Sequence, residues 1–209
     1  MNTSITNSAL SVAKPVFEKW FERLVETVSF KYKTVMMKDR EHFWDYLERT
    51  YAKFSKIRPV GFREQLDFMK VYIPLTLQSR KNEERKVVVD DYPIQLLSSE
   101  KHILIVDNAG MGKSTLSKRM FLGAFENGEY GIPLYVELRH LSKDNNVLQE
   151  ILKQIRNLSS EFNEKLLSIL LEKGVFVLFL DGYDEISLND KEVVTEALLA
   201  FINKAGNNT

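Results

Sequence analysis

A short apolar run followed by a glycine-rich loop, in residues 103–116, limits the possible folds more than any other part of the chain. Residues 103–106 have the composition of a buried β-strand, and the pattern from Leu116 onward predicts a helix. Between them stands the loop Asp107-Asn108-Ala109-Gly110-Met111-Gly112-Lys113-Ser114-Thr115. A strand that enters a helix through such a loop is typical of phosphate-binding loops, so these residues predict an α/β fold with a parallel sheet.

Each residue type in this loop suits the binding of a polyphosphate. Glycine lets backbone N–H groups turn inward around the phosphates, and the N-terminus of the following helix adds partial positive charge. We expect Lys113 to reach the β- and γ-phosphates and Ser114 to bind Mg²⁺. The predicted cofactor-binding residues are Asn108, Ala109, Gly110, Met111, Gly112, Lys113, Ser114 and Thr115.

Asp107 stands where the full loop pattern has its first glycine. Aspartate tolerates turn conformations better than most residues, but its carboxylate adds a negative charge near the phosphates. We therefore expect a reduced affinity for the nucleotide. An ordinary glycine-rich turn between a strand and a helix is the alternative interpretation of the loop.

A second apolar run, residues 175–180, ends in a cluster of carboxylates. A phosphate-binding loop needs a partner carboxylate on a neighbouring strand to hold Mg²⁺, and Asp181 directly follows this run. We expect Asp181 to bind Mg²⁺, directly or through water, and the catalytic residues Asp184 and Glu185 to polarise an attacking water. A strand end followed by an acidic helix cap is the alternative.

Short apolar runs alternate with helical patterns throughout the second half of the chain, which is typical of βαβ units. The predicted strands cover residues 102–106, 133–138 and 175–180. The predicted helices cover residues 112–125, 147–155, 161–173 and 191–204. Together with the phosphate-binding loop, this alternation predicts an α/β fold, a P-loop parallel sheet with flanking helices, preceded by a helical N-terminal region.

The N-terminal region shows two amphipathic helical patterns, residues 12–25 with Pro15 in the first turn and residues 39–57. Their aromatic residues could form a base-stacking surface, but helical spacing without interleaved basic residues favours core packing. Residues 79–86 mix both charges, and they are either a linker near a domain boundary or the turn of a surface hairpin.

Composition excludes several function classes. Lys plus Arg and Asp plus Glu both number 29, so the net charge is zero and gives no signal for nucleic acid or anionic lipid. The chain contains no cysteine, which excludes disulfide scaffolds, thiol nucleophiles and cysteine-ligated metals. We see no secretory signal and no apolar run of the roughly 20 residues that span a membrane. We expect a soluble, cytoplasmic protein.

Three segments together resemble the NACHT domains, a family within the STAND class of P-loop NTPases. They are residues 109–116, 132–139 and 180–186. The last is the most specific, because in that family a small residue follows the Mg²⁺-binding aspartate, as Gly182 does here, and acidic residues come just after. Residues 70–77 also resemble the segment that precedes prokaryotic NACHT domains. The predicted domains are a helical N-terminal region of unassigned role, residues 1–89, and a NACHT-type nucleotide-binding domain, residues 90–209.

The resemblance implies a regulatory ATPase. Such a protein binds ATP with Mg²⁺, exchanges or hydrolyses it when it senses a ligand, and then self-associates through its NTPase domain. Prokaryotic relatives commonly act in defence against phage. The preference for ATP over GTP is inferred from the family. The sequence does not reveal which ligand is sensed.

The resemblance also implies a further strand after residue 209, inserted between residues 103–106 and residues 175–180. Its absence leaves these two strands without a shared neighbour, so we expect a fragment with weak or no hydrolysis in isolation. One alternative is a degenerate nucleotide-binding adaptor without turnover, which Asp107 favours. A nucleotide kinase is disfavoured, because no arginine-bearing lid follows Asp181.

Overall fold

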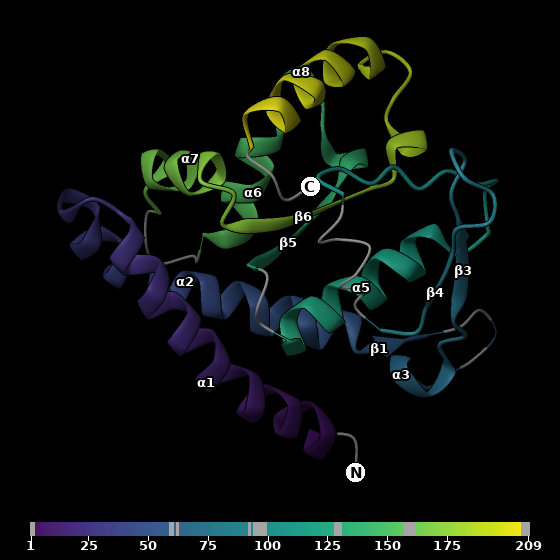
Figure 1. Ribbon diagram of the computed structural model, residues 1–209, viewed down its shortest axis with the longest axis horizontal. Coiled ribbons are helices and arrows are strands. Elements are labelled where there is room, and N and C mark those ends of the chain that lie inside the picture. Colours follow the sequence, from purple (N-terminus) through teal and green to yellow (C-terminus); the bar gives the residue numbers. More distant parts are fainter. Residues whose placement is uncertain are drawn as a thin grey trace.

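The computed structural model describes residues 3–58, 61, 63–91, 93, 100–127, 131–156 and 162–205 (Figure 1). Within these ranges, no helix has both the length and the apolar character needed to cross a membrane. One apolar core runs from the N-terminal helices to the strands of the second half.

A parallel pair of strands stands at the centre of the second half (Figure 1). Strand β5 (Ile132–Glu137) and strand β6 (Phe176–Asp181) pair from Ile132 opposite Phe176 to Glu137 opposite Asp181. A 3₁₀ turn follows each strand, Leu138–His140 after β5 and Tyr183–Glu185 after β6. The carboxyl ends of both strands therefore lie at the same edge of the pair.

Helices cover both faces of this pair. They are α5 (Lys113–Asn127), α6 (Val147–Ile155), α7 (Glu164–Glu172) and α8 (Lys191–Lys204). Helix α5 packs on one face against both strands, and α6 packs on the other face with α8 beside it (Figure 1). The predicted α/β fold with parallel strands and flanking helices is confirmed. The helix predicted over residues 161–173 is shorter in the structure: residue 161 lies outside the described residues, and α7 begins only after Asn163, whose side chain accepts the Leu166 amide at its N-terminus.

Two long helices open the chain, α1 (Thr3–Thr27) and α2 (Phe30–Phe54), and they pack against each other. Both begin earlier than the predicted helices, because a helix can extend beyond the apolar stripe that it buries. The prediction that Pro15 stands in a first turn is wrong, since Pro15 lies inside α1. The small and polar residues before it gave no periodic signal.

Helix α2 packs its aromatic residues against the second half of the chain. Tyr51 lies 4.9 Å from Phe125 of α5 between ring centroids, and Phe43 lies 5.9 Å from Phe176 of β6. These four side chains are buried. The interpretation of the aromatic stripe as core packing is therefore confirmed, and the N-terminal helices share one core with the parallel strands.

Two antiparallel strand pairs and a short helix lie between α2 and the loop before α5. They are β1 (Lys56–Ile57) paired with β2 (Leu66–Asp67), α3 (Phe68–Val71), and β3 (Leu75–Gln78) paired with β4 (Lys86–Val89). Residues 79–86, the mixed-charge segment, form the turn of the β3–β4 hairpin and enter β4. Of the two interpretations of this segment, the surface hairpin is the one observed.

The predicted strand over residues 102–106 is wrong. These residues pair with no described strand, and Leu104 and Val106 are 88% and 51% exposed. Strand β6 pairs only with β5 among the described residues. An apolar run becomes a strand only when another backbone meets its N–H and C=O groups, and no described segment does so here.

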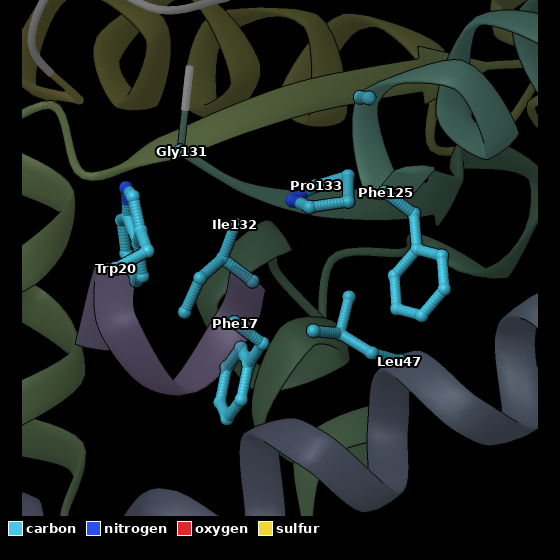
Figure 2. A pocket seen from close by; sticks show the side chains of 8 residues that line it. Phe17, Trp20, Leu47, Phe125, Gly131, Ile132 and Pro133 are labelled. Atoms are coloured by element: carbon cyan, nitrogen blue, oxygen red, sulfur yellow. The ribbon is translucent and has the colours of Figure 1, made fainter. Parts of the chain in front are cut away.

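A cavity of about 20 Å³ remains where α1, α2, α5 and the start of β5 meet (Figure 2). Its walls include Phe17, Trp20, Leu47, Phe125 and Ile132. The space is close to that of one water molecule, but a water needs several polar partners, and these walls are mainly apolar. We interpret the cavity as imperfect packing between the N-terminal helices and the strands.

Candidate functional site

Two glycines shape the loop before α5. Gly110 and Gly112 have φ angles of +80° and +85°, in the left-handed region that strains residues carrying a Cβ atom. The Leu116 amide donates to the Gly112 carbonyl over 2.8 Å, so α5 begins directly at the loop. The first-turn amides of α5 have no partner within the helix and are available to an anion.

The Lys113 side chain folds back across the loop. Its Nζ atom donates to the carbonyl oxygens of Asp107, over 2.9 Å, and of Asn108, over 3.0 Å. The ammonium group therefore lies over the turn in which a polyphosphate would sit.

The Asp107 side chain forms a hydrogen bond with the backbone of the loop, in addition to its charge. Its Oδ1 atom accepts a hydrogen bond from the Asn108 amide over 2.7 Å. The carboxylate thus occupies an N–H group of the loop, besides placing a negative charge beside it. Both effects agree with the expected reduction in affinity.

The β3–β4 hairpin packs against the loop. A Cβ atom placed on Gly112 would lie 3.2 Å from Cδ1 of Leu75, in strand β3. Asn108, Ala109, Gly110 and Met111 are exposed, whereas Ser114 and Thr115 are half-buried in the first turn of α5. The sequence did not predict that this hairpin supports the loop.

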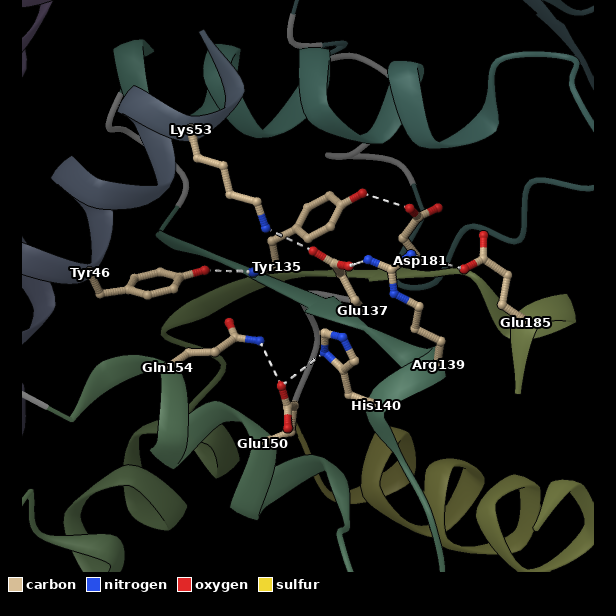
Figure 3. Close-up of polar contacts among 10 residues, drawn as sticks. All are labelled: Tyr46, Lys53, Tyr135, Glu137, Arg139, His140, Glu150, Gln154, Asp181 and Glu185. Atoms are coloured by element: carbon tan, nitrogen blue, oxygen red, sulfur yellow. Dashed lines mark hydrogen bonds and ion pairs between the residues drawn. The ribbon is translucent and has the colours of Figure 1, made fainter. Parts of the chain in front are cut away.

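Asp181 lies half-buried at the carboxyl end of β6, and Tyr135 of β5 holds it (Figure 3). The Tyr135 hydroxyl donates to Asp181 Oδ2 over 2.7 Å. Burial, the hydrogen bond to Asp181 and the neighbouring carboxylates raise the pKa of Tyr135 well above its ordinary value, so the hydroxyl stays protonated. One carboxylate oxygen is therefore restrained while the other is available.

The turn after β6 depends on Gly182, whose φ of +80° permits a reversal that a Cβ atom would strain. A Cβ atom there would lie 3.4 Å from the carboxyl carbon of Glu185. The turn thus folds Glu185 back against the end of the strand. Asp184 and Glu185 are both exposed in this turn.

An ion-pair chain ends at Glu185 (Figure 3). Arg139 Nη1 lies 3.4 Å from Glu185 Oε2, and Arg139 Nη2 pairs with Glu137 at the end of β5. Lys53 of α2 donates to the same Glu137 carboxylate over 2.9 Å. Partial burial alone would raise the pKa of Glu137, but Lys53 and Arg139 outweigh it, and the pKa lies below its ordinary value.

The predicted site residues thus occupy two places, the loop before α5 and the turn after β6. Helix α5, which begins at Lys113, packs against both strands whose carboxyl ends carry the acidic residues. The Ser114 hydroxyl and the Asp181 carboxylate are hard oxygen ligands of the kind that Mg²⁺ prefers, and the glycine turn with Lys113 suits phosphate. The residues present therefore fit a nucleotide with Mg²⁺.

A glycine loop opening a helix, beside parallel strands that end in carboxylates, defines the chain as a P-loop nucleotide-binding protein. The sequence model of the NACHT domain matches residues 101–206, which is half of the chain. The chain belongs to the NACHT domain family and contains a nucleotide-binding NTPase module of the STAND type. Searches of curated proteins and of solved structures found no match.

Sequence reasoning missed the side chains that hold the acidic residues. Tyr135, Glu137 and Arg139 lie within a segment used only to support the family resemblance, and Lys53 lies in the N-terminal region. A signal was nonetheless available: Tyr135 and Glu137 are polar residues at alternate positions of an otherwise apolar strand, which places them on one face.

Proposed function

We propose that this chain binds ATP with Mg²⁺ and acts as the nucleotide-dependent switch of a STAND-class signalling protein. The observation that carries the proposal is the loop itself, in which two left-handed glycines lead into α5 and Lys113 folds over the turn. The proposed nucleotide-binding residues are Asn108, Ala109, Gly110, Met111, Gly112, Lys113, Ser114 and Thr115.

Binding would begin with an exchange of partners at Lys113. Its ammonium group leaves the two loop carbonyls for the β- and γ-phosphates, while the first-turn amides of α5 receive the remaining phosphate oxygens. Ser114 and Asp181 would hold Mg²⁺, which neutralises charge on the phosphates. Because α5 packs against both strands, a change at the loop can reach the core.

Hydrolysis would depend on the turn after β6. Asp184 and Glu185 are proposed to polarise the attacking water, and Glu185 is tied to Arg139. The Arg139 contact and the Lys113 contacts both have to change before the chemistry proceeds. We therefore propose weak turnover for the isolated chain, with exchange or hydrolysis of ATP in response to a sensed ligand.

The wider role follows from the family. We propose a cytoplasmic signalling protein that self-associates through its NTPase domain and takes part in antiphage defence. The proposed domain boundaries stay at residues 1–89 and 90–209, with the two parts sharing one core.

A nucleotide-binding adaptor without turnover is the second candidate. It is favoured by the Asp107 carboxylate, which occupies the Asn108 amide and adds negative charge at the loop. The two candidates differ in catalysis, not in the fold or the site. Single-turnover hydrolysis measured with excess protein distinguishes them.

The experiment that tests the proposal is a titration with a fluorescent ATP analogue, with and without Mg²⁺. Lys113→Ala should abolish binding because it removes the cation that faces the phosphates. Lys101→Ala is the matched control, since it removes an exposed lysine a few residues before the loop. Equal binding by both variants and the unmodified chain would refute the assignment of the loop.

A further inference from the structure

Two chains of contacts lead from helix α2, through β5, to two acidic residues of the site (Figure 3). One ends at Asp181 and the other at Glu185. Helix α2 lies outside the segment that the family model matches. A helix of the N-terminal region is thus connected, through intervening side chains, to the groups that would handle Mg²⁺ and water.

The first chain is buried. The Tyr135 amide donates to the Tyr46 hydroxyl of α2 over 2.8 Å, on the edge of β5 that faces away from β6. The Tyr135 hydroxyl then donates to Asp181. Phe54 of α2 packs edge-on against the Tyr135 ring, with 4.7 Å between centroids. Helix α2 therefore fixes both the backbone and the ring of the residue that restrains Asp181.

The second chain is more exposed. It runs from Lys53 through Glu137 and Arg139 to Glu185. The Lys53 and Arg139 side chains are 66% and 52% exposed, whereas Glu137 is only 19% exposed. Solvent and salt screen such pairs, so this chain contributes less than the buried one.

We propose that Tyr135 is the positioning residue for Asp181, and that helix α2 acts through Tyr135 to set how tightly the site holds Mg²⁺ with a nucleotide. The inference rests on the proposed function, since it assumes that Asp181 binds Mg²⁺. The hydroxyl fixes Oδ2 and leaves Oδ1 for the metal. A hydrogen-bond partner of this kind commonly contributes 10- to 100-fold in metal affinity.

Thermodynamic linkage makes the coupling reciprocal. If the position of α2 changes the affinity for Mg²⁺, then Mg²⁺ binding must change the equilibrium position of α2 by the same factor. The N-terminal helices would thereby report the state of the nucleotide site, or impose it. This gives the helical N-terminal region a role in the switch.

The first test measures how nucleotide binding depends on the Mg²⁺ concentration, using the fluorescent ATP analogue. Tyr135→Phe removes only the hydroxyl, and it should raise the half-saturating Mg²⁺ concentration about tenfold. Tyr46→Phe should raise it by less, because it loosens the backbone of β5 and leaves the hydrogen bond to Asp181 in place. Circular dichroism melting checks that both variants are folded.

Tyr51→Phe is the matched control. Tyr51 also lies on α2, and its hydroxyl also donates to a carboxylate, that of Glu126 on α5, over 2.9 Å. Glu126 stands near the end of α5 opposite the loop. The control variant should therefore keep the Mg²⁺ dependence of the unmodified chain.

The second test follows α2 directly. The chain has two tryptophans, so Trp20→Phe leaves Trp44 of α2 as the only one. Trp44 is buried 5.4 Å from Phe17 and 6.0 Å from Phe125, which makes its emission sensitive to movement of α2. Adding Mg²⁺ to the chain with bound ATP should change this emission. In the Tyr135→Phe variant, the Trp44 emission should not change with Mg²⁺, even at Mg²⁺ concentrations that saturate that variant.

The outcomes separate the inference from the proposed function. A half-saturating Mg²⁺ concentration for Tyr135→Phe within twofold of the unmodified chain overturns the inference, provided that Asp181→Asn weakens Mg²⁺ dependence. If Asp181→Asn has no effect either, the assignment of Asp181 as a metal ligand fails and the inference fails with it. If Tyr135→Phe is unfolded under the conditions of the titration, Tyr46→Phe is measured in its place. An unchanged Mg²⁺ dependence of that variant then overturns the inference.

Discussion

Gly131 stands immediately before β5, and we expect its replacement by alanine to destabilise the chain strongly. Its φ of +129° lies outside the range that residues with a Cβ atom readily adopt. A Cβ atom placed there would lie 2.4 Å from the carbonyl oxygen of Val175. That oxygen cannot easily move, because it accepts the Ile132 amide over 3.1 Å where the two parallel strands begin to pair.

The magnitude follows from two contributions. A backbone held in a sparsely populated region costs on the order of 1–3 kcal/mol, and inserting a methyl group into a packed site costs about 1–3 kcal/mol. We expect Gly131→Ala to lower the free energy of unfolding by about 3 kcal/mol. For a chain of this size, that corresponds to a fall of about 6–12 °C in the melting temperature.

Urea unfolding followed by tryptophan fluorescence measures the change, and Gly61→Ala is the matched control. Gly61 also has a positive φ, +87°, but no atom lies within 4 Å of the position that its Cβ would take. The control should therefore lose only the backbone contribution, about 1–2 kcal/mol. If Gly131→Ala costs no more than Gly61→Ala, the contact with the carbonyl oxygen does not limit the packing of β5 on β6.

Three further predictions concern charge and pH. Lys53→Met should lower the free energy of unfolding by only about 0.2–1 kcal/mol at low salt, because the lysine side of its pair with Glu137 is exposed. The loss should vanish in 0.5 M salt. Lys38→Met, which removes an exposed lysine of the same helix, should show no such salt dependence. Asp107→Gly should tighten ATP-analogue binding severalfold, since it removes a negative charge and frees a loop amide; unchanged or weaker binding would contradict this account of the loop. Burial and the nearby Glu126 carboxylate raise the pKa of Tyr51 in the folded state. The Tyr51 hydroxyl therefore contributes fully to stability below the unfolded pKa of about 10, and this contribution is lost as the pH rises above that value. The free energy of unfolding in urea, measured between pH 8 and 11, should fall less steeply for Tyr51→Phe than for the unmodified chain.

Two of the predicted helices agree with the structure at both ends. Residues 147–155 and 191–204 match α6 and α8 at both ends. At the start of α6, Asn146 accepts from the Gln149 amide, and the Gln149 side chain accepts from the Asn146 amide, so the boundary is set by neighbouring residues. The start of α1 was missed, because small and polar residues continue a helix without an apolar stripe.

Some residues of the candidate site could be located from the sequence, and others could not. The loop and the acidic turn could be located from the sequence, because glycine spacing and a run of carboxylates are local patterns. Lys53, Tyr135 and Arg139 could not be assigned roles, because their partners lie far away along the chain. The contact between Tyr135 and Asp181 spans 46 residues, and that between Lys53 and Glu137 spans 84.

Residues 102–106 show why the remaining part needed the tertiary structure. Their apolar composition predicted a strand, yet they pair with no described strand, and Leu104 is largely exposed. The sequence by itself determined the glycine loop, the acidic turn and the amphipathic helices, because each depends on the conformational preferences of a few adjacent residues. Only the tertiary structure decided which backbones pair and which side chains hold Asp181, because those contacts depend on how distant segments pack.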